Sequence, residues 1–249
     1  PARALVHSPE KVHLVSLPGI EPVVGDFEDI DSIRKALEGV NAVFLLTHPS
    51  LRQADHQMLV IDTARETGVR KIVKLSALGA SKDSSVLLAR MHAKADHHLM
   101  ESGIAYTILR PHYFMQNTFG WLDTIRSQGA FYAPMMDGRI SLIDVRDVAE
   151  VAVAALTEDA HVNLVYELTG PEALTFGELA DKLSDASGMD IRFVDVYPEQ
   201  ARRGMMESGY PDWLADSMLE LMSIFSMGYA SAVSDTVEKV TGHGARSFD

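Results

Sequence analysis

Cysteine is absent from the 249-residue sequence, and this absence excludes several kinds of site at once. A disulfide framework, a thiolate metal site, a cysteine nucleophile and a redox-active cysteine pair all need the missing residue. We therefore expect a cytoplasmic protein. Long apolar runs are missing too, because no stretch approaches the roughly 18 residues of a membrane-spanning helix. The opening Pro-Ala-Arg lacks the charged-then-apolar pattern of a secretory signal, so no membrane partner is expected.

Basic residues are scarce in the last part of the chain. The formal net charge is −13, and residues 1–150 hold 16 Lys and Arg against 18 Asp and Glu. Residues 151–249 hold only 6 against 17. The near-neutral first part can accept an anionic cofactor, whereas the acidic remainder repels nucleic acid and anionic membranes. Nucleic-acid binding is therefore not expected.

Short apolar runs alternate with helical patterns along the first half of the chain. This alternation needs crossover connections, which produce a doubly wound α/β fold with a parallel sheet. The sequence has no internal repeat of about 20–50 residues, which argues against a solenoid or a propeller. The pattern predicts strands at Ala2–Val6, Ile20–Val24, Ala42–Thr47, Lys71–Ser76 and Ala105–Leu109, and helices near Ile30–Glu38, Leu51–Glu66 and Val86–Glu101.

The rhythm changes after residue 120. Glu178 stands three residues after Thr175, which is the spacing of a capping box at the start of a helix. Residues 198–227 are helical and rich in methionine, and they predict a small C-terminal cap over the sheet. We expect a main domain over residues 1–156 and a smaller region over 157–249. Further elements are predicted as strands near Gly129–Tyr132, Arg139–Ile143, Leu164–Thr169 and Ile191–Val196, and as a helix over Asp144–Leu156.

Small and polar residues follow three successive strands, at the sheet edge where ligands bind in open parallel sheets. Gly25, Asp26 and Phe27 end the second strand, where glycine lets a ring approach the backbone and aspartate can accept from an exocyclic amine. Asp26 could instead help to cap the next helix. The following strand ends are Leu46-Thr47-His48-Pro49 and Leu75-Ser76-Ala77, whose hydroxyl groups can contact sugar, phosphate or nicotinamide. We therefore predict a ligand cleft at this edge.

Residues 109–117, Leu-Arg-Pro-His-Tyr-Phe-Met-Gln-Asn, form the most specific run in the chain. Pro111 has no N–H group, so we expect the strand ladder to stop before it. The aromatic, methionine and amide side chains that follow would cross the mouth of the cleft. The alternative is an ordinary strand-to-helix turn whose aromatic residues pack in the core.

Six segments belong together as a set. They are Gly25-Asp-Phe-Glu-Asp, residues 37–47 (Leu-Glu-Gly-Val-Asn-Ala-Val-Phe-Leu-Leu-Thr), residues 64–73 (Ala-Arg-Glu-Thr-Gly-Val-Arg-Lys-Ile-Val), Tyr106-Thr-Ile-Leu-Arg-Pro, Asp144-Val-Arg-Asp-Val-Ala and residues 168–176 (Leu-Thr-Gly-Pro-Glu-Ala-Leu-Thr-Phe). The set resembles the NmrA-like branch of the atypical short-chain dehydrogenase/reductases over about residues 1–200. The resemblance implies a Rossmann fold with an NAD(P) site. It also implies relatives that reduce quinones, azo compounds or specialised metabolites, or that sense redox state without turnover.

One departure from the family pattern lies at the beginning of the sequence. The family starts with a strand and a Gly-x-x-Gly-x-x-Gly turn that holds the pyrophosphate, and these 249 residues contain neither. The missing strand would lie between Ala2–Val6 and Ala42–Thr47, and its loss would leave unpaired backbone groups in the sheet. We therefore expect the natural protein to be longer at its N-terminus. Without those residues, the flanking strands should close up and ordinary dinucleotide binding should be lost.

A second departure concerns proton delivery. Short-chain dehydrogenases use Tyr and Lys four residues apart, whereas the matching helix here reads His92-Ala-Lys-Ala-Asp96. His92 could act as an acid near neutral pH or pack within an apolar helical stripe. The resemblance implies that His92 is a fixed element of the cofactor site. The neighbouring His97 and His98 point to different sides of the helix, so no metal is expected.

The choice of cofactor stays open. His7 and Ser8 follow the first predicted strand, where relatives that prefer NADP carry arginine and NAD users carry an acid. Neither type is present, and we expect NADP or NAD, with NADPH as the first choice. The predicted cofactor contacts are His7, Ser8, Gly25, Asp26, Phe27, Leu46, Thr47, His48, Pro49, Ser76, Ala77, His92, Pro111, Phe114 and Asn117.

The leading hypothesis is an NAD(P)H-dependent reductase that moves hydride to a planar, electron-poor acceptor such as a quinone or an azo compound. Such an acceptor needs little general-acid help, which agrees with the absent Tyr/Lys pair. Asp26 and Phe27 would flank adenine, and His112 or Tyr113 would be the catalytic proton donor. Thr47 and Ser76 would line the middle of the cofactor, Pro111–Asn117 would approach the nicotinamide, and the substrate would lie under Phe114, Met115, Met135 and the cap.

Two rival hypotheses remain open. The protein could be a regulator that senses NADP(H) and contacts another protein without turnover. The 249 residues alone could also bind no nucleotide. For the enzyme, the expected partner is a small-molecule substrate, and a homodimer is compatible with the sequence.

Overall fold

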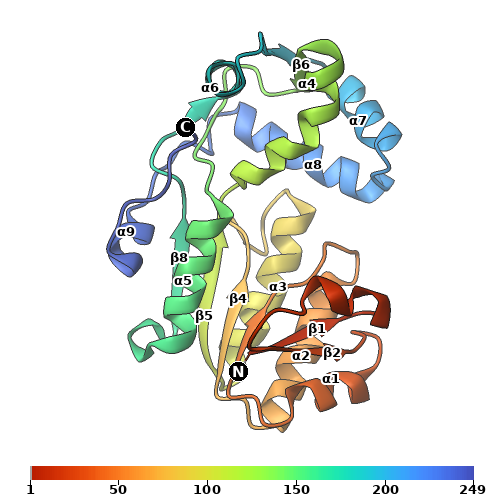
Figure 1. Ribbon diagram of the computed structural model, residues 1–249, viewed down its shortest axis with the longest axis vertical. Coiled ribbons are helices and arrows are strands. Elements are labelled where there is room, and N and C mark those ends of the chain that lie inside the picture. Colours follow the sequence, from red (N-terminus) through yellow and green to blue (C-terminus); the bar gives the residue numbers. More distant parts are fainter. Residues whose placement is uncertain (1) are drawn as a thin grey trace. The chain divides into compact units, whose positions relative to one another are not determined.

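The computed structural model describes residues 2–249, in which strands and helices alternate through most of the chain (Figure 1). The chain divides into two compact units, each built from several segments. Unit 1 comprises residues 1–75, 91–108 and 155–164, and unit 2 comprises residues 76–90, 109–154 and 165–249. The units interleave along the chain, which differs from the single boundary expected after residue 156. The reason is that β5 (Ala105–Pro111) and the long helices α3 (Leu87–Glu101) and α5 (Val145–Thr157) each contribute residues to both units.

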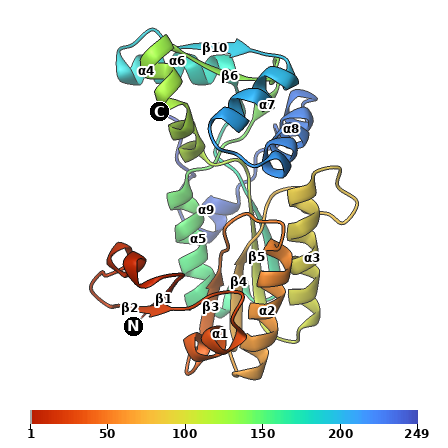
Figure 2. The same cartoon turned by 90° about the vertical axis from the view of Figure 1, so that its right-hand side faces the viewer.

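Unit 1 has parallel strand pairs covered by helices. Strand β1 pairs with β2 in parallel, with Ala2 opposite Ile20, and β3 pairs with β4 in parallel, with Ala42 opposite Lys71. Helices α1 and α2 lie side by side against these strands (Figure 2). Besides parts of β5, α3 and α5, the elements are β1 (Ala2–Val6), η1 (Pro9–Leu14), β2 (Ile20–Val24), α1 (Ile30–Leu37), β3 (Ala42–Leu45), α2 (Gln53–Glu66), β4 (Lys71–Leu75) and η3 (Asp159–His161).

The two strand pairs of unit 1 belong to different sheets. In the described residues, β1 and β2 form a two-stranded sheet, whereas β3 begins the order β3-β4-β5-β8. The flanking strands therefore do not close up, contrary to the expectation for a chain without the central strand. Arg3 of β1 instead donates to the carbonyl groups of Ala36 and Glu38 at 2.8 and 3.0 Å, which fastens β1 to the end of α1.

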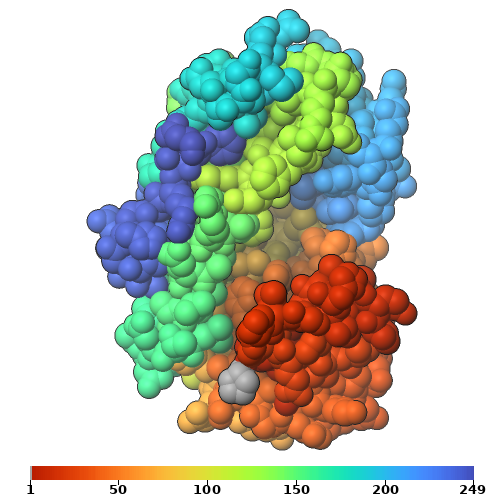
Figure 3. Space-filling view, viewed as in Figure 1, coloured from red at the N-terminus to blue at the C-terminus, as the bar shows by residue number. Residues whose placement is uncertain are grey.

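Apolar side chains near this division stay exposed. Leu5 of β1 is 37% exposed and Phe44 of β3 is 40% exposed. The segment from β1 to β2 (red) lies at the surface in Figure 3. Unit 1 nevertheless has its own apolar core, made by buried residues of α1, α2, β3, β4, α3 and β5 and of the turns before β4 and β5: Ile33, Leu37, Leu45, Val60, Ile61, Ala64, Val69, Ile72, Leu99, Ile104 and Ile108.

Unit 2 is built from short strands and many helices. Strand β6 pairs with β10 in parallel, and β7 pairs with β9 in antiparallel fashion. Helices α7 and α8 lie side by side in both views, and Arg202 joins them through Asp212 and Asp216 at 2.7 Å each (Figures 1 and 2). The elements are η2 (Met115–Trp121), α4 (Leu122–Gln128), β6 (Ala130–Ala133), β7 (Arg139–Ile140), β8 (Leu164–Leu168), β9 (Leu174–Thr175), α6 (Phe176–Ser187), β10 (Arg192–Asp195), α7 (Pro198–Glu207), α8 (Asp212–Ser226) and α9 (Thr236–Thr241).

Aromatic rings dominate the core of unit 2. Trp121 stacks on the fully buried Phe131 with ring centroids 4.2 Å apart and an interplanar angle of 6°. Phe176 and Phe193 pack against the same ring at 6.1 and 5.7 Å. Aromatic rings packed in this way stabilise the core beyond the effect of the apolar area that they bury, because ring pairs prefer particular relative orientations. The core of unit 2 is therefore defined by helix η2, strands β6 and β10, and the start of α6.

Several local signals behave as the sequence predicts. Asp29 caps α1 by accepting from the Asp31 amide at 3.0 Å, and Gly39 follows the helix with a φ of 71°. Thr175 and Glu178 form both bonds of the predicted capping box. Strand β5 differs, because it continues through Pro111 rather than ending at Leu109. Proline lacks a donor, but its carbonyl group still accepts from the Leu78 amide at 2.9 Å.

None of the helices within residues 2–249 combines the length and apolarity needed to cross a bilayer.

Candidate functional site

The turn after β2 joins two predicted site residues. Asp26 places a carboxylate oxygen 3.6 Å from Nδ1 of His7, at the end of the neighbouring strand β1. Asp26 also accepts from the Glu28 amide at 2.9 Å, so it organises the turn while Asp29 performs the capping. Gly25 is buried, and a Cβ atom there would lie 2.7 Å from a methyl carbon of Leu5. The close approach of Leu5 therefore favours glycine at this position.

The next residue, Phe27, is half-buried and stacks on His56 of α2, with ring centroids 5.7 Å apart and an interplanar angle of 20°. His56 in turn contacts Glu28 at 2.8 Å, and Arg52 also pairs with Glu28. The hydrogen bond from His56 lowers the pKa of Glu28, with Arg52 as a further cause. The sequence did not single out His56 or Arg52. Ser8, also predicted as a contact, is half-buried beside the exposed His7.

A buried polar cluster lies at the end of β3. Thr47 is buried, and its hydroxyl oxygen accepts from Nε2 of Gln57 at 2.8 Å. One turn earlier on α2, Gln53 lies 3.2 Å from Nε2 of His92 on α3. The amide oxygens of Gln53 and Gln57 have no hydrogen-bond partner within residues 2–249, nor does the hydroxyl of Ser50. Buried acceptors without donors cost free energy, so this set fits a ligand that presents hydroxyl or amide groups.

The other predicted contacts on this turn, Leu46, His48 and Pro49, are exposed. Sequence analysis found Thr47 and His92 but missed Gln53 and Gln57. The available signal was their spacing of four residues, which places two amides on one face of α2.

A buried ion pair also lies inside unit 1. Lys74 on β4 is fully buried and donates to a carboxylate oxygen of Asp96 on α3 at 2.8 Å, and Asp96 is 2% exposed. Asp96 stands one helical turn after His92, which places the acid and the imidazole on the same face of α3. Lys74 was not among the predicted site residues. The ion pair therefore joins β4 to the face of α3 that also carries His92.

In unit 2, the predicted residues after β4 are held by their backbone. Ser76 is buried, and its amide donates to the Leu109 carbonyl at 2.7 Å. Ala77 is half-buried and Pro111 is buried. Because the Pro111 carbonyl also accepts from the Leu78 amide at 2.9 Å, the pairing with β5 continues past the end of β4.

His112, one of the two predicted catalytic residues, has an unusual environment for a proton donor. Its imidazole is 6% exposed and stacks on Phe225 at 5.3 Å. Nδ1 accepts from the Tyr113 amide at 2.7 Å, and the ring also hydrogen-bonds the Ala230 carbonyl. Burial lowers the pKa of His112 to about 4. At neutral pH the ring is therefore uncharged, and both nitrogens are engaged with backbone groups.

Tyr113, the other predicted catalytic residue, is half-buried and meets Phe225 edge-on at 6.0 Å. Its hydroxyl group hydrogen-bonds the side chain of the exposed Asn117, and burial raises its pKa to about 12. Tyr113 is therefore protonated at neutral pH and can donate a hydrogen bond. Phe114 is half-buried beside it and bridges to Ile143.

Two residues expected under the substrate lie in the apolar core instead. Met115 is 7% exposed and Met135 is fully buried, and both belong to the aromatic cluster of unit 2. Their packing gives them a structural role, because a residue sealed within the core offers no surface to a ligand.

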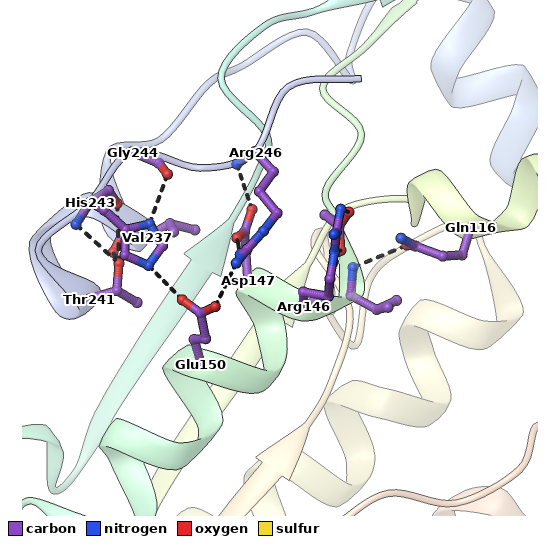
Figure 4. A network of polar contacts seen from close by, with 11 residues as sticks. Gln116, Arg146, Asp147, Glu150, Val237, Thr241, His243, Gly244 and Arg246 are labelled. Atoms are coloured by element: carbon purple, nitrogen blue, oxygen red, sulfur yellow. Dashed lines mark hydrogen bonds and ion pairs between the residues drawn. The ribbon is translucent and has the colours of Figure 1, made fainter. Parts of the chain in front are cut away.

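The Asp144-Val-Arg-Asp-Val-Ala motif has a structural function at the start of α5 (Figure 4). Asp144 accepts from the Arg146 amide and guanidinium, and these hydrogen bonds lower the pKa of Asp144 to about 2. The fully buried Asp147 accepts from the Arg246 amide at 2.8 Å and pairs with its guanidinium. Glu150 then binds Arg246 at 2.7 Å and His243 at 2.5 Å. The motif therefore anchors the segment around α9 on α5.

Comparison with known proteins adds the family context. The sequence profile of the NAD(P)H-binding family matches residues 1–159. An NAD(P)H azoreductase from Xenophilus azovorans is 39% identical over 248 residues, a match that covers 100% of this chain and 87% of the relative. Quinone oxidoreductase 2 from Escherichia coli strain K12 is 31% identical over 242 residues, covering 96% of this chain and 84% of the relative.

A solved structure shows the same architecture. The crystal structure of an NADPH-dependent quinone oxidoreductase from Escherichia coli, complexed with NADPH, matches with a TM-score of 0.88 at 29% identity. The match covers 99% of this chain and 87% of that one. It confirms the predicted Rossmann-type α/β fold.

Proposed function

This chain belongs to the NAD(P)H-binding family, and from that premise we propose that it is an NAD(P)H-dependent reductase of small, planar, electron-poor acceptors such as quinones and azo compounds. The observation that carries the proposal is that this chain matches an NAD(P)H azoreductase over 100% of its own length. The likeness to a quinone oxidoreductase that holds NADPH supports the same type of reaction. The proposed substrate of this chain is therefore a small molecule.

Unit 1 supplies the side chains suited to the polar parts of the cofactor. Thr47, Gln53 and Gln57 would hold ribose or amide groups, since their buried oxygens include acceptors that lack donors. His7 and Asp26 would lie toward adenosine, with Phe27 beside them. The pyrophosphate is the part of the cofactor for which residues 2–249 offer no glycine-rich turn. Gly25, Ser8, His92 and the turn Leu46, His48 and Pro49 remain predicted contacts.

Unit 2 supplies the side chains proposed to act on the acceptor. The reduced nicotinamide provides the hydride when bound, and the protein provides orientation and exclusion of water. Tyr113 is the proposed hydrogen-bond donor, because its raised pKa keeps the hydroxyl group protonated. An acceptor oxygen or nitrogen that gains electron density would accept from this hydroxyl. Ser76, Ala77, Pro111, Phe114 and Asn117 remain predicted contacts of unit 2.

Three finer points belong to the same proposal. NADPH is the first choice of cofactor, which the NADPH in the related quinone oxidoreductase supports. A cytoplasmic location and a homodimer are retained as predictions from the sequence.

The test begins with binding. NADPH and NADH are titrated by fluorescence against the 249-residue chain and against the same chain extended by the corresponding N-terminal residues of the azoreductase relative. We expect saturable NADPH binding by the extended chain, and then acceptor-dependent NADPH consumption with a panel of quinones and azo dyes. Absence of binding by both chains would contradict the proposal. Binding without consumption of NADPH by any acceptor would instead favour the regulator that senses NADP(H).

A further inference from the structure

The imidazole of His112 is a junction between backbone segments. Nδ1 accepts from the Tyr113 amide at 2.7 Å, and the ring also bonds the Ala230 carbonyl. Because Nδ1 acts as an acceptor, the donor to Ala230 must be Nε2. The two bonds together select one neutral tautomer, with the proton on Nε2. The backbone amide of His112 is fixed separately, by donation to the Leu168 carbonyl of β8 at 2.8 Å.

The Ala230 carbonyl is itself part of a buried arrangement. It accepts from the Ser141 amide at 3.1 Å, and Ser141 is fully buried while Ala230 is 2% exposed. The hydroxyl of Ser141 reaches on to the Ala232 carbonyl at 2.7 Å. His112 therefore ties the chain after β5 to a segment near residue 230 that is already fixed. Buried hydrogen bonds of this kind are costly to break singly, because the abandoned partner stays away from water.

Tyr113 receives its position from these contacts. Its amide donates to His112, and its carbonyl accepts from the Ile143 amide at 3.0 Å. Both His112 and Tyr113 lie against the ring of Phe225, one stacked and the other edge-on. The backbone of Tyr113 is thus held on both sides, which fixes the direction of its Cα–Cβ bond, and its hydroxyl group hydrogen-bonds the side chain of Asn117.

We propose that His112 is a positioning residue that orients Tyr113, rather than a proton donor. This inference rests on the proposed reductase function. A donor would need a ring N–H aimed at the substrate, but Nδ1 of His112 already accepts from the Tyr113 amide and the residue is only 6% exposed. A second proton on Nδ1 would face the Tyr113 amide, donor against donor. Burial also disfavours the charged ring, and within the described residues no charged side chain contributes to this effect.

The test uses variants that separate the two bonds. His112→Asn keeps an acceptor within reach of the Tyr113 amide but cannot reach Ala230. His112→Phe keeps the stack on Phe225 and loses both bonds. His243→Phe changes an exposed histidine in the same unit and serves as the matched control. Turnover, KM and NADPH affinity are measured for each variant, alone and combined with Tyr113→Phe, in the protein form that binds NADPH.

If His112 acts by positioning, His112→Phe lowers kcat by on the order of tenfold to a hundredfold, the scale of a misplaced reacting group. Its NADPH affinity changes little, and His112→Asn recovers part of the lost kcat. Adding Tyr113→Phe to His112→Phe costs little more, because His112 acts through Tyr113. Independent, multiplying effects of the two substitutions would overturn the inference. So would a limb near the ordinary histidine pKa in the wild-type kcat profile that His112→Phe removes.

A readout without turnover keeps this test separate from the proposed function. In protein labelled with 15N-histidine and 13C-tyrosine, His112 should show the Nε2–H tautomer at neutral pH. The ring resonance of Tyr113 should move in His112→Phe and stay in His243→Phe. If no acceptor supports turnover but these signals appear, the reductase proposal fails while the structural claim about His112 stands. A mixture of tautomers or an unmoved Tyr113 signal would overturn the positioning claim whatever the activity.

Discussion

The strand ends of unit 1 and of unit 2 use their polar groups differently. In unit 1, side chains bond to side chains, as in Thr47 with Gln57 and Gln53 with His92. In unit 2, the His112 side chain bonds to two backbone groups, and the Ser76 amide joins the strand ladder. In unit 1 the amide oxygens of Gln53 and Gln57 are left without a hydrogen-bond partner among the described residues. In unit 2 both ring nitrogens of His112 are engaged.

This difference separates recognition from positioning. A cluster with unpaired acceptors can gain bonds when a ligand with donors arrives, so it suits the hydroxyl-rich part of a cofactor. A histidine saturated by backbone contacts gains nothing from a ligand, but it holds the neighbouring residue in place. Identical residue types, such as the two histidines His92 and His112, therefore require separate functional interpretations. The units also differ in their ion pairs, because the Lys74–Asp96 pair of unit 1 is buried and the Arg202 pairs of unit 2 are exposed. Breaking these pairs should give the largest difference in the free energy of unfolding.

Breaking the buried pair of unit 1 should destabilise the protein strongly. Lys74→Met leaves Asp96 without its main partner in a site that is 2% exposed, and we expect a loss of about 3–5 kcal/mol in the free energy of unfolding. The matched change in unit 2 is Arg202→Met, whose carboxylate partners are exposed, and it should cost less than about 1 kcal/mol. Urea unfolding measures both.

The double variant Lys74→Met with Asp96→Leu is the control for charge burial. It should recover most of the lost stability, because no charge is then left unpaired. If Lys74→Met and Arg202→Met cost the same, the contrast between the two units would be wrong.

Acid should weaken the protein through His112. Its folded pKa lies near 4, below the ordinary value of 6.5, so the unfolded chain binds the proton more readily. The stabilisation that comes from keeping His112 neutral is complete above the unfolded pKa of 6.5. It is lost as the pH falls from 6.5 through the folded pKa of about 4, and the total loss is up to about 3 kcal/mol. Wild type should therefore lose more stability between these pH values than His112→Phe.

His97→Phe, an exposed change in unit 1, provides the comparison for this pH series. It should follow the wild-type curve. An acid loss in His112→Phe equal to that of wild type would show that the ring at position 112 is not the neutral, buried group described.

Glycine substitutions give the smallest effect on stability and sharpen the assignment of unit 1. In Gly25→Ala the new Cβ meets the flexible end of Leu5, and we expect a loss of about 1 kcal/mol. Gly177 of unit 2 lies within α6, where the atom nearest to a new Cβ is the Thr175 hydroxyl oxygen at 3.8 Å, and Gly177→Ala should gain up to about 1 kcal/mol. Thermal unfolding measures both changes.

NADPH titration of the same two variants shows whether Gly25 also contacts the cofactor. Affinity should fall in Gly25→Ala and stay unchanged in Gly177→Ala. Equal affinity in both variants would leave Gly25 with a packing role alone.

Much of the fold was predictable because the signals that fix it are local. Asp29, Gly39 and the pair Thr175 and Glu178 act within one helical turn, and each behaves as expected. The extension of β5 through Pro111 was missed because the prediction considered only that proline has no N–H group to donate. The Pro111 carbonyl group can still accept a hydrogen bond, and it does so from the Leu78 amide. The separation of β1 from β3 was not predicted, and neither were the contacts of Arg3 with the end of α1, because sequence spacing does not reveal them.

The candidate site was predictable only in part. Thr47, Asp26 and Ser76 were predicted from strand ends, because the carboxyl ends of parallel strands meet at one edge of a sheet. In the described residues β2, which precedes Asp26, belongs to a different sheet from β3 and β4, and cofactor contact by all three residues stays a prediction. Lys74 carried an overlooked signal, since a lysine within an apolar strand needs a buried partner. The bond between His112 and Ala230 had no signal at all, as the two residues are far apart in the sequence.

The most direct test of the account is quinone-dependent oxidation of NADPH, compared with NADPH deuterated at the carbon that gives up hydride. We predict saturable consumption that needs both NADPH and the quinone, slowed by deuterium and lowered in Tyr113→Phe. Tight binding of NADPH with no consumption, across quinones and azo dyes alike, would contradict the central claim that this protein is a reductase.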